Sequence, residues 1–391
     1  MKKKHIHFVQ LWGVIILLTV MVFTAGCEQE APTTPESTAG TDATEEITQP
    51  APVQQKYDLG KDVLYFGRTY EKSRIHWFNW SGSGFSIRFK GSSVLAEFYS
   101  NAPDTRNLAY LKVYVDGVEM QDIILKDECQ IVTLAEGLDP AQEHTVEVRK
   151  RTNARSSTAG VGRIVLMDGT ILPPAQEKER LIEFLGDSLT VGYVAAKDGK
   201  TATSWSTTTE DVTGTYCPQI AGAFDAEYQT VAISGRGIVR NNGGDAKILF
   251  PDIYRELDLY NNPGVAYDFA RQPDVIVINL GTNDESNANK ELSREEFRQG
   301  LLVFLKEVRQ HNPDAQIIYA YGLVRVGLSD TIASVIEQLR SEGDSKLHYL
   351  QLEQCQAWEL NLNHTVSSAY GSRGEALIDK IAEITGWQSE E

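Results

Sequence analysis

Between about residues 57 and 171 the apolar positions fall into short runs, several of which alternate with polar positions. The clearest runs are at residues 85–89, 94–98, 111–115 and 145–148. Such alternation arises when one face of a strand is buried, and Asp116-Gly117 after the third run is typical of a hairpin turn. No segment here has the period of a long helix. The pattern therefore predicts an antiparallel β-sandwich.

A different pattern begins after Pro173-Pro174. Amphipathic helical segments separate continuous apolar or β-branched runs, which lie at residues 182–185, 230–233, 275–280, 316–321 and 347–352. Strands covered on both faces have such runs, and their alternation with helices predicts a parallel sheet of the α/β class. In the clearest helix, Ser293 is the expected N-cap, Glu296 completes a capping box, and Pro313 follows the end.

The first 26 residues have the pattern of an export signal. Lysines at positions 2–4 precede an apolar run from Leu11 to Phe23, and Thr24-Ala25-Gly26-Cys27 follows. The apolar run is shorter than the roughly 18 residues that a transmembrane helix needs. A signal peptide over residues 1–26 is therefore the favoured interpretation, and a membrane span is the alternative.

Cys27 directly after Ala25-Gly26 resembles the acylated cysteine of bacterial lipoproteins, which predicts lipidation at Cys27 and attachment to a membrane. Thr24 departs from that motif, because leucine is usual there, so cleavage without lipidation and free secretion are the alternative. The segment that follows is rich in Thr, Glu, Pro, Gln and Ala, which favours a disordered linker. The expected organisation is signal peptide (1–26), linker (27–56), β-sandwich (57–175) and α/β domain (176–391).

The chain is strongly acidic, with a formal net charge of −17, and the predicted signal carries lysines but no acids. Such a surface repels nucleic acid and favours a neutral or cationic substrate, although solubility alone explains the charge. Beyond Cys27 the cysteines are Cys129, Cys217 and Cys355, so an exported chain has at most one internal disulfide. No Cys/His cluster has zinc-site spacing, so we expect no metal and no cofactor.

Three short polar motifs begin where predicted parallel strands end. They are Gly186-Asp187-Ser188-Leu189, Ser234-Gly235 and Gly281-Thr282-Asn283-Asp284. The carboxyl ends of parallel strands form the edge where open sheets place their active sites. Ser188 is the candidate nucleophile, and the Ser188 N–H, the Gly235 N–H and the Asn283 amide are candidate donors to an oxyanion. Each motif taken alone is also an ordinary turn.

His364 is the candidate general base, and it is found by elimination. His5 and His7 lie in the predicted signal, and the remaining histidines lie in the β-rich region, at a helix end or within a strand: His76, His144, His311 and His348. His364 lies between the last predicted strand and the closing helix, so its loop returns over the carboxyl edge of the sheet. A surface-loop histidine without a role is the alternative.

These motifs, in this order, resemble the four blocks of the SGNH (GDSL) hydrolases, in which Ser, Gly, Asn and His carry the chemistry. A narrower likeness is to family 2 carbohydrate esterases, to which Lys150-Arg151-Thr152-Asn153-Ala154 and Leu172-Pro173-Pro174 are also similar. The resemblance covers the chain from about residue 60 to its end. It implies a jelly-roll sandwich joined to a flavodoxin-like SGNH domain, and removal of acetyl groups from polysaccharides such as xylan and mannan.

The chain departs from the SGNH pattern beside the histidine. Asn361 stands where many members have the aspartate of a triad, and Thr365 stands where a proline often follows the histidine. The resemblance therefore implies a Ser-His dyad, with the backbone carbonyl of Asn361 or a neighbour orienting the imidazole. Without such orientation the domain would bind and not catalyse. Stacking on sugar faces is one role for three aromatic residues near the motifs, but packing in the core is favoured, so they are not among the predicted site residues: Tyr193, Trp205 and Trp358.

The sequence thus predicts an extracytoplasmic, membrane-anchored or secreted O-acetyl esterase that acts on polysaccharide or oligosaccharide as a monomer. One alternative keeps the mechanism and changes the substrate to a lipid, a thioester or an envelope glycan. Another alternative, from a different class, is a surface lipoprotein that binds glycan without catalysis.

Overall fold

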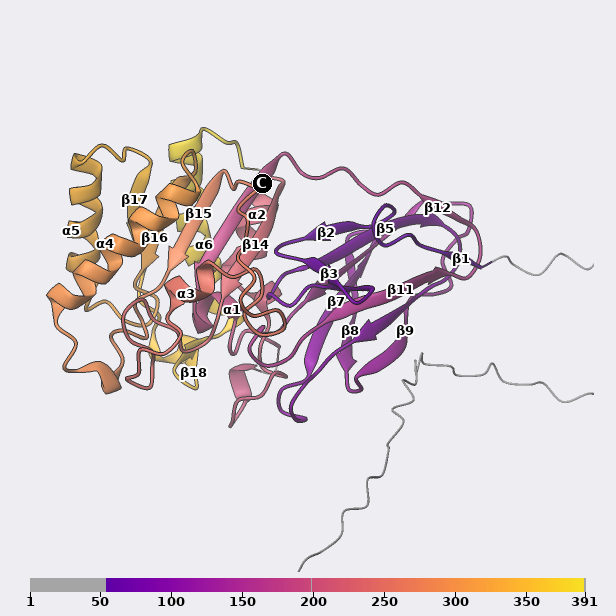
Figure 1. Cartoon of the computed structure of the whole chain (residues 1–391), viewed down its shortest axis with the longest axis horizontal. Coiled ribbons are helices and arrows are strands. Elements are labelled where there is room, and N and C mark those ends of the chain that lie inside the picture. The colour runs from indigo at the N-terminus through magenta and orange to yellow at the C-terminus, as the bar shows by residue number, and fades with distance from the viewer. Residues whose placement is uncertain (1–53, 198, 390–391) are drawn as a thin grey trace, which may run out of the picture. The chain divides into compact units, whose positions relative to one another are not determined.

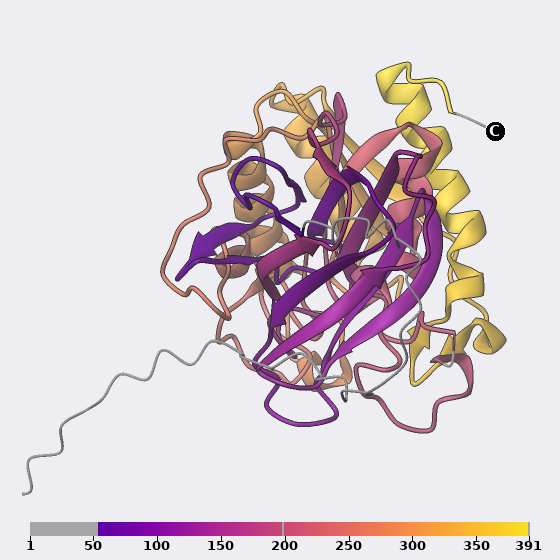
Figure 2. The same ribbon diagram turned by 90° about the vertical axis from the view of Figure 1, so that its right-hand side faces the viewer.

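Two antiparallel sheets form the amino-terminal part of the computed structural model, which describes residues 54–197 and 199–389. The predicted signal peptide, Cys27 and the linker up to residue 53 lie outside these residues. One sheet has the order β3-β4-β11-β6-β9 with β1 beside β11, and the other has the order β12-β5-β10-β7-β8 with β2 beside β5. The two sheets are drawn in indigo to magenta in Figure 2. The strands are β1 (Gln55–Lys56), β2 (Leu64–Phe66), β3 (Tyr70–Lys72), β4 (Ile75–Trp77), β5 (Gly84–Lys90), β6 (Val94–Tyr99), β7 (Ala109–Val115), β8 (Val118–Leu125), β9 (Cys129–Ala135), β10 (His144–Lys150), β11 (Gly160–Leu166) and β12 (Thr170–Leu172).

The predicted β-sandwich is confirmed, and its core follows from the alternation of its strands. In β6, Val94, Ala96 and Phe98 are buried while the residues between them are partly exposed. The hairpin between β7 and β8 turns at Asp116 and Gly117, both with positive φ, as the two central residues of a type I′ turn require. In β8 the first five residues are exposed, so this strand carries no alternation that the sequence pattern could reveal.

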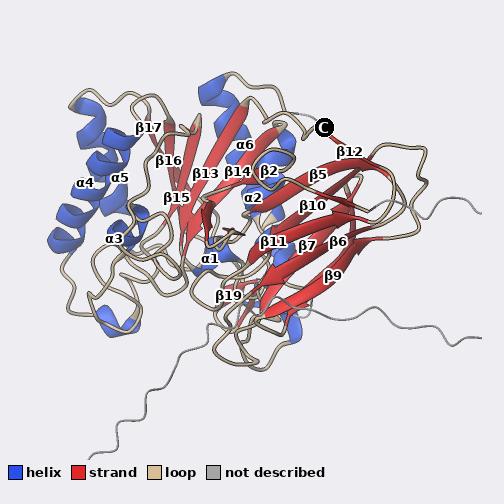
Figure 3. Cartoon of the chain, turned by 45° about the vertical axis from the view of Figure 1, so that its right-hand side comes forward, coloured by secondary structure: helices blue, strands red, loops and turns tan. Residues whose placement is uncertain are grey.

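The carboxy-terminal part is a five-stranded parallel sheet with helices on both faces (Figures 1 and 3), as predicted. Its order is β14-β13-β15-β16-β17, and the order of strands along the chain reverses beside β13. The strands are β13 (Arg180–Gly186), β14 (Ala226–Ala232), β15 (Val275–Asn279), β16 (Gln316–Tyr321) and β17 (Leu347–Gln351). The predicted domain boundary after residue 175 falls in the connection between β12 and β13.

Alternate residues of the central strands pack against different helices. Ile276 and Ile278 contact the layer of α3, α4 and α5, whereas Val275 and Val277 contact the layer of α2 and α6. The helices are α1 (Ser188–Val191), α2 (Tyr216–Ala223), α3 (Phe250–Tyr254), α4 (Arg294–His311), α5 (Ser329–Ser341) and α6 (Gly371–Thr385). None of the helices in the part of the chain that the structure describes is long and apolar enough to cross a membrane.

Helix α4 begins where the sequence predicts, but only half of the expected capping box forms. The Ser293 hydroxyl accepts a hydrogen bond from the Glu296 N–H at 3.0 Å. The Glu296 side chain does not reach back to the N-cap, because it pairs with the Arg240 guanidinium instead. A charged partner on a neighbouring loop thus competes with the local contact that the sequence suggests.

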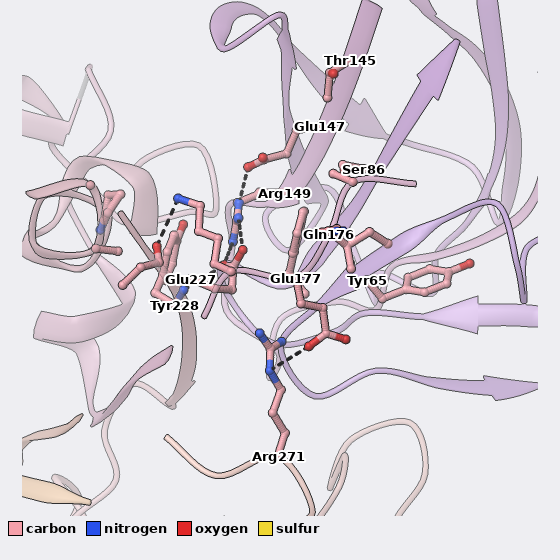
Figure 4. A pocket seen from close by; sticks show the side chains of 18 residues that line it. Tyr65, Ser86, Thr145, Glu147, Arg149, Gln176, Glu177, Glu227, Tyr228 and Arg271 are labelled. Atoms are coloured by element: carbon pink, nitrogen blue, oxygen red, sulfur yellow. Dashed lines mark hydrogen bonds and ion pairs between the residues drawn. The ribbon is translucent and has the colours of Figure 1, made fainter. Parts of the chain in front are cut away.

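Two buried ion pairs join the sandwich to the parallel sheet. Arg149 on β10 donates from Nη1 and Nη2 to the two carboxylate oxygens of Glu227 on β14 at 3.0 and 3.1 Å. Arg68 pairs with Glu183 on β13 at 3.3 Å. A cavity of about 310 Å³ lies beside Arg149 (Figure 4), and there Arg149 is held between two glutamates while Arg271 faces Glu177. Charged side chains that line this cavity pair with one another, so we assign the cavity to the contact between the sandwich and the parallel sheet.

Candidate active site

The four predicted site residues come together at the carboxyl edge of the parallel sheet. Ser188 follows β13, Gly235 follows β14, Asn283 follows β15, and His364 follows β17 along the chain. In an open sheet the ligand site lies where the strand order reverses, and here that point is at β13. All four residues line one cavity of about 920 Å³.

Ser188 is presented by a tight connection from strand to helix. Gly186 is required there, because a Cβ at this position would lie 2.0 Å from the Thr190 Oγ1. Asp187 is the N-cap of α1, and its Oδ1 accepts the Leu189 N–H at 3.0 Å. Ser188 is the first residue of the helix, so its N–H has no acceptor within the helix and is available to a ligand.

His364 faces the Ser188 hydroxyl from a short hairpin made of β18 (Leu360–Asn361) and β19 (His364–Thr365). Its Nε2 lies 2.9 Å from the Ser188 Oγ, and its Nδ1 lies 2.8 Å from the Leu362 carbonyl oxygen. The carbonyl takes the Nδ1–H, which leaves Nε2 as an acceptor for the serine proton. Burial lowers the pKa of His364 below its usual value, and the Leu362 carbonyl opposes that shift.

The acceptor behind the imidazole is the Leu362 carbonyl, a neighbour of Asn361 as expected from the missing aspartate. The Asn361 side chain points elsewhere, since its Nδ2 donates to the carbonyls of Gly199 and Ala202 at 2.6 and 2.9 Å. Leu362 and Asn363 form the hairpin turn with φ of 47° and 61°. The orientation of the imidazole therefore depends on a two-residue turn, a feature that the sequence motif does not reveal.

The candidate oxyanion donors lie on the other side of the serine. Gly235 has a φ of 83°, a left-handed conformation that suits glycine. The loop after it is held by the Asp284 carboxylate, which accepts the backbone N–H groups of Ile238, Val239 and Arg240 at 2.7 to 2.9 Å. The Asn283 Nδ2 donates to the Asp187 carboxylate at 2.9 Å and to the Arg236 carbonyl at 2.8 Å. Both amide hydrogens thus have acceptors before a substrate arrives.

Two buried carboxyl groups support these donors. Burial raises the pKa of Asp187 to about 7 and, nearby, the pKa of Asp284 to about 6. Their charge is compensated by backbone N–H donors, as a buried carboxylate requires. The sequence motif contains both aspartates, but their supporting role follows only from these contacts.

Two of the aromatic residues for which the sequence favours a core role lie at the site. The Tyr193 ring stacks on the His364 imidazole at a centroid distance of 4.1 Å, and Trp205 stacks on Tyr193 at 5.3 Å. Both line the cavity, whereas Trp358 does not line it and is 69% exposed. A tyrosine five residues after the nucleophile carries no motif of its own, so its stacking on the histidine was not predictable.

The sandwich contributes to the same cavity. Asn107 follows the turn before β7, and Asn153, Arg155 and Ser156 lie between β10 and β11; all four line the wall. Of these four residues, only Asn153 lies in the segment 150–154, whose likeness to the carbohydrate esterases is a sequence signal. Within the described residues, no group of His, Cys, Asp or Glu side chains is arranged to hold a metal ion, and Cys217 and Cys355 are buried thiols outside any disulfide.

Comparisons with known proteins agree with this architecture. A family model described as carbohydrate esterase 2 N-terminal matches residues 65–175, and one described as GDSL-like lipase/acylhydrolase family matches residues 184–356. The chain is 33% identical over 289 residues to an acetylxylan esterase / glucomannan deacetylase of Cellvibrio japonicus, a match that covers 68% of this chain and 74% of the relative. It is 29% identical to the cellulase/esterase CelE of Acetivibrio thermocellus over 70% of this chain and 33% of that protein.

Solved structures show the same fold. A family two carbohydrate esterase from Clostridium thermocellum in complex with cellohexaose matches with a TM-score of 0.77 and 26% identity, over 83% of this chain and 99% of that one. An acetyl xylan esterase (Est2A) from the rumen bacterium Butyrivibrio proteoclasticus matches with a TM-score of 0.76 and 21% identity, over 86% and 100% of the two chains.

Proposed function

Because the chain belongs to carbohydrate esterase family 2 and is a carboxylic ester hydrolase of the acetylxylan esterase type, we propose that it removes acetyl groups from a polysaccharide or oligosaccharide by Ser-His catalysis. The observation that supports this mechanism best is the 2.9 Å contact between the Ser188 Oγ and the His364 Nε2. A serine needs such a base, because its hydroxyl is a weak nucleophile at its own pKa.

The reaction proceeds in two halves. The Ser188 Oγ attacks the acetyl carbonyl carbon while its proton moves to the His364 Nε2. The tetrahedral intermediate then expels the sugar oxygen, which takes the proton back from Nε2 and leaves as a hydroxyl. Water, deprotonated by the same nitrogen, attacks the acetyl-serine, and acetate leaves with Ser188 restored.

The proposed donors to the negative oxygen of each intermediate are the N–H groups of Ser188 and Gly235 and the Asn283 amide. Ser188, Gly235 and Asn283 follow β13, β14 and β15 and line one cavity, which supports this role. Because both Asn283 hydrogens already have acceptors, the oxyanion shares one of them with the Asp187 carboxylate or the Arg236 carbonyl. The held amide needs no reorientation when charge develops, which favours the transition state.

The dyad works without an acidic third member. The Leu362 carbonyl fixes the imidazole tautomer, and the Tyr193 ring stacked on His364 gives the imidazolium a face rich in electrons. These contacts argue against a purely glycan-binding domain, in which nothing would orient the base. The cavity wall is rich in asparagine and arginine, which disfavours the long acyl chain of a lipase substrate.

The reaction is tested by acetate release from acetylated xylan and by hydrolysis of 4-nitrophenyl acetate. Ser188→Ala and His364→Ala are each expected to lower kcat by about 10⁴-fold or more, while Ser368→Ala, an exposed serine near the histidine, serves as the matched control. Rates of Ser188→Ala close to those of the unmodified protein would remove Ser188 as the nucleophile. Faster hydrolysis of octanoate than of acetate esters would favour the lipase alternative.

We propose further that the enzyme is extracytoplasmic and that an acylated Cys27 attaches it to a membrane. This proposal is supported by the charged, apolar and small-residue pattern of residues 1–26. Expression of the full chain and of Cys27→Ser tests it: the original protein is expected in the membrane fraction and the variant in the soluble extracytoplasmic fraction. Identical distribution of the two proteins would rule out the anchor.

A further inference from the structure

The wall of the active-site cavity carries positive charge that the proposed reaction does not use. Arg155 and Arg325 both line the cavity, and no aspartate or glutamate does so among the residues that the structure describes. The whole chain has a net charge of −17, so a cavity lined by two guanidinium groups and by no carboxylate of the described residues is an exception on this molecule. The exception lies beside the nucleophile, where the substrate must bind.

Arg155 is held so that its guanidinium enters the cavity. It is the exposed residue in an otherwise buried segment, residues 151–160, which fixes its backbone between the sandwich and the sheet. Its Nη1 lies 3.5 Å from the Ser234 carbonyl oxygen and 3.9 Å from the position that a Cβ of Gly235 would occupy. In the described part of the chain no carboxylate pairs with it, so the charge next to the candidate oxyanion site is not neutralised.

Arg325 supplies a second guanidinium in the same cavity. It lies in the loop between β16 and α5, is half-buried, and makes no hydrogen bond or ion pair within residues 54–197 and 199–389. In the sheet, β14 is the neighbour of β13 on one side, and β16 lies two strands away on the other. Ser234, which Arg155 contacts, and Arg325 thus lie in loops that follow strands on either side of β13, and both arginines line the same cavity as Ser188.

We propose that this cavity selects acetylated glycans that carry uronic acid carboxylates, and that Arg155 and Arg325 each bind a uronate carboxylate beside the acetylated sugar. The inference rests on the proposed deacetylase function and names its substrate class. Arginine suits this role, because its planar guanidinium binds a carboxylate through two parallel hydrogen bonds. The net charge of the chain predicts a neutral or cationic substrate, but that prediction treats the surface charge as uniform. The two arginines in the cavity favour an anionic substrate instead.

Two forms of one polymer test the proposal. Acetylated glucuronoxylan is compared with the same polymer after enzymatic removal of its glucuronic acid side chains, and kcat/KM for acetate release is measured on each. The unmodified protein is expected to prefer the acidic polymer by about ten-fold, the usual scale of a hydrogen bond to a charged group. Raising the ionic strength from about 0.01 to 0.1 M, which shortens the screening length from about 30 to 10 Å, is expected to reduce this preference.

The preference should depend on the two arginines and not on positive charge in general. Arg155→Gln and Arg325→Gln are each expected to lower the ratio of acidic to neutral kcat/KM several-fold, and the double variant to bring the ratio to about one. Arg155→Lys is expected to recover part of it, because an ammonium keeps the charge without the planar pair of donors. Arg294→Gln is the matched control, since Arg294 is exposed, has no ion pair in the described structure and lies outside the cavity. Thermal unfolding confirms that each variant is folded.

The results separate this inference from the proposed function. If the unmodified protein releases no acetate from either polymer and does not hydrolyse 4-nitrophenyl acetate, the deacetylase proposal fails. If it deacetylates both polymers with equal kcat/KM, or if the double variant keeps the preference, the deacetylase proposal stands and the assignment of a uronate site is overturned.

Discussion

Ser188, Gly235 and Asn283 lie at or beyond the ends of three adjacent buried strands, whereas His364 lies in a two-stranded hairpin outside that sheet. On the serine side, each loop is held by a buried carboxylate: Asp187 caps α1 and holds Asn283, and Asp284 holds the loop after Gly235. On the histidine side, the supports are a backbone carbonyl, a stacked ring and a left-handed turn. The serine side is thus built into the core of the sheet, and the histidine side is built from local geometry.

In the proposed mechanism, this difference removes the need for a triad aspartate. A hairpin that places its own carbonyl 2.8 Å behind the imidazole fixes the tautomer with no side chain at all. The contribution that is lost is the carboxylate's stabilisation of the imidazolium. The histidine side should therefore be sensitive to small changes in its turn and its stacking partner, and the serine side to removal of a donor.

Among variants that keep Ser188 and His364, Asn283→Ala is expected to have the largest effect, because it removes a proposed oxyanion donor and the clamp between Asp187 and the Arg236 carbonyl. Loss of one oxyanion donor costs about 2.7 to 4 kcal/mol, which is a fall of roughly 10²- to 10³-fold in kcat. The measurement is kcat on 4-nitrophenyl acetate, with Asn287→Ala, an exposed asparagine on the same cavity wall, as the control. A fall of less than about ten-fold would leave Asn283 as a structural clamp only.

Asn361→Asp restores the acid that the family pattern contains, yet it is not expected to build a triad. The Asn361 amide donates to two carbonyls, and a carboxylate there would face both oxygens without a hydrogen to offer. We expect a loss of about 1 to 3 kcal/mol in the free energy of unfolding and no gain in kcat/KM. Urea unfolding and steady-state kinetics measure both, with Gln388→Glu, an exposed amide outside the cavity, as the control. Faster catalysis would show that the new carboxylate reaches the imidazole.

The pH dependence of kcat/KM tests the environment of the base. Burial lowers the pKa of His364 below its usual 6.5, and only the neutral imidazole accepts the serine proton. Activity is therefore expected to be retained as the pH falls through 6.5, and then to decrease ten-fold per pH unit, about 1.4 kcal/mol, below the lowered pKa. A half-maximal point above pH 6.5 would contradict this and point to a carboxylate near the ring.

Tyr193→Ala removes the ring stacked on His364. A stacked aromatic pair contributes about 0.5 to 1.5 kcal/mol beyond its buried area, so kcat/KM should fall by about 2- to 10-fold. Tyr193→Phe keeps the ring and is expected to recover most of the activity. If the phenylalanine variant is as slow as the alanine variant, the hydroxyl and not the ring acts at the site.

The two sides of the site also differ in how far the sequence reveals them. Ser188, Gly235 and Asn283 follow apolar runs that mark buried strands, so topology alone brings them together. The Leu362 carbonyl has no such signal, because a backbone oxygen is present at every residue and only the turn aims this one. Arg155 has no sequence signal either, since its place in the cavity depends on how the sandwich packs against the sheet through Arg149 and Arg68.

The hairpin turn itself gives the smallest expected effect. Asn363 has a φ of 61°, a conformation that asparagine and glycine adopt readily and that costs alanine about 1 kcal/mol because of its Cβ. Asn363→Ala should therefore lower the stability of the hairpin by about that amount, and Asn363→Gly by no more than a few tenths of a kcal/mol. Because the same turn carries His364 and the carbonyl behind it, the alanine variant should lose kcat in parallel with stability while KM stays near its original value. Equal behaviour of the two variants would mean that the imidazole is held by Tyr193 and not by the turn.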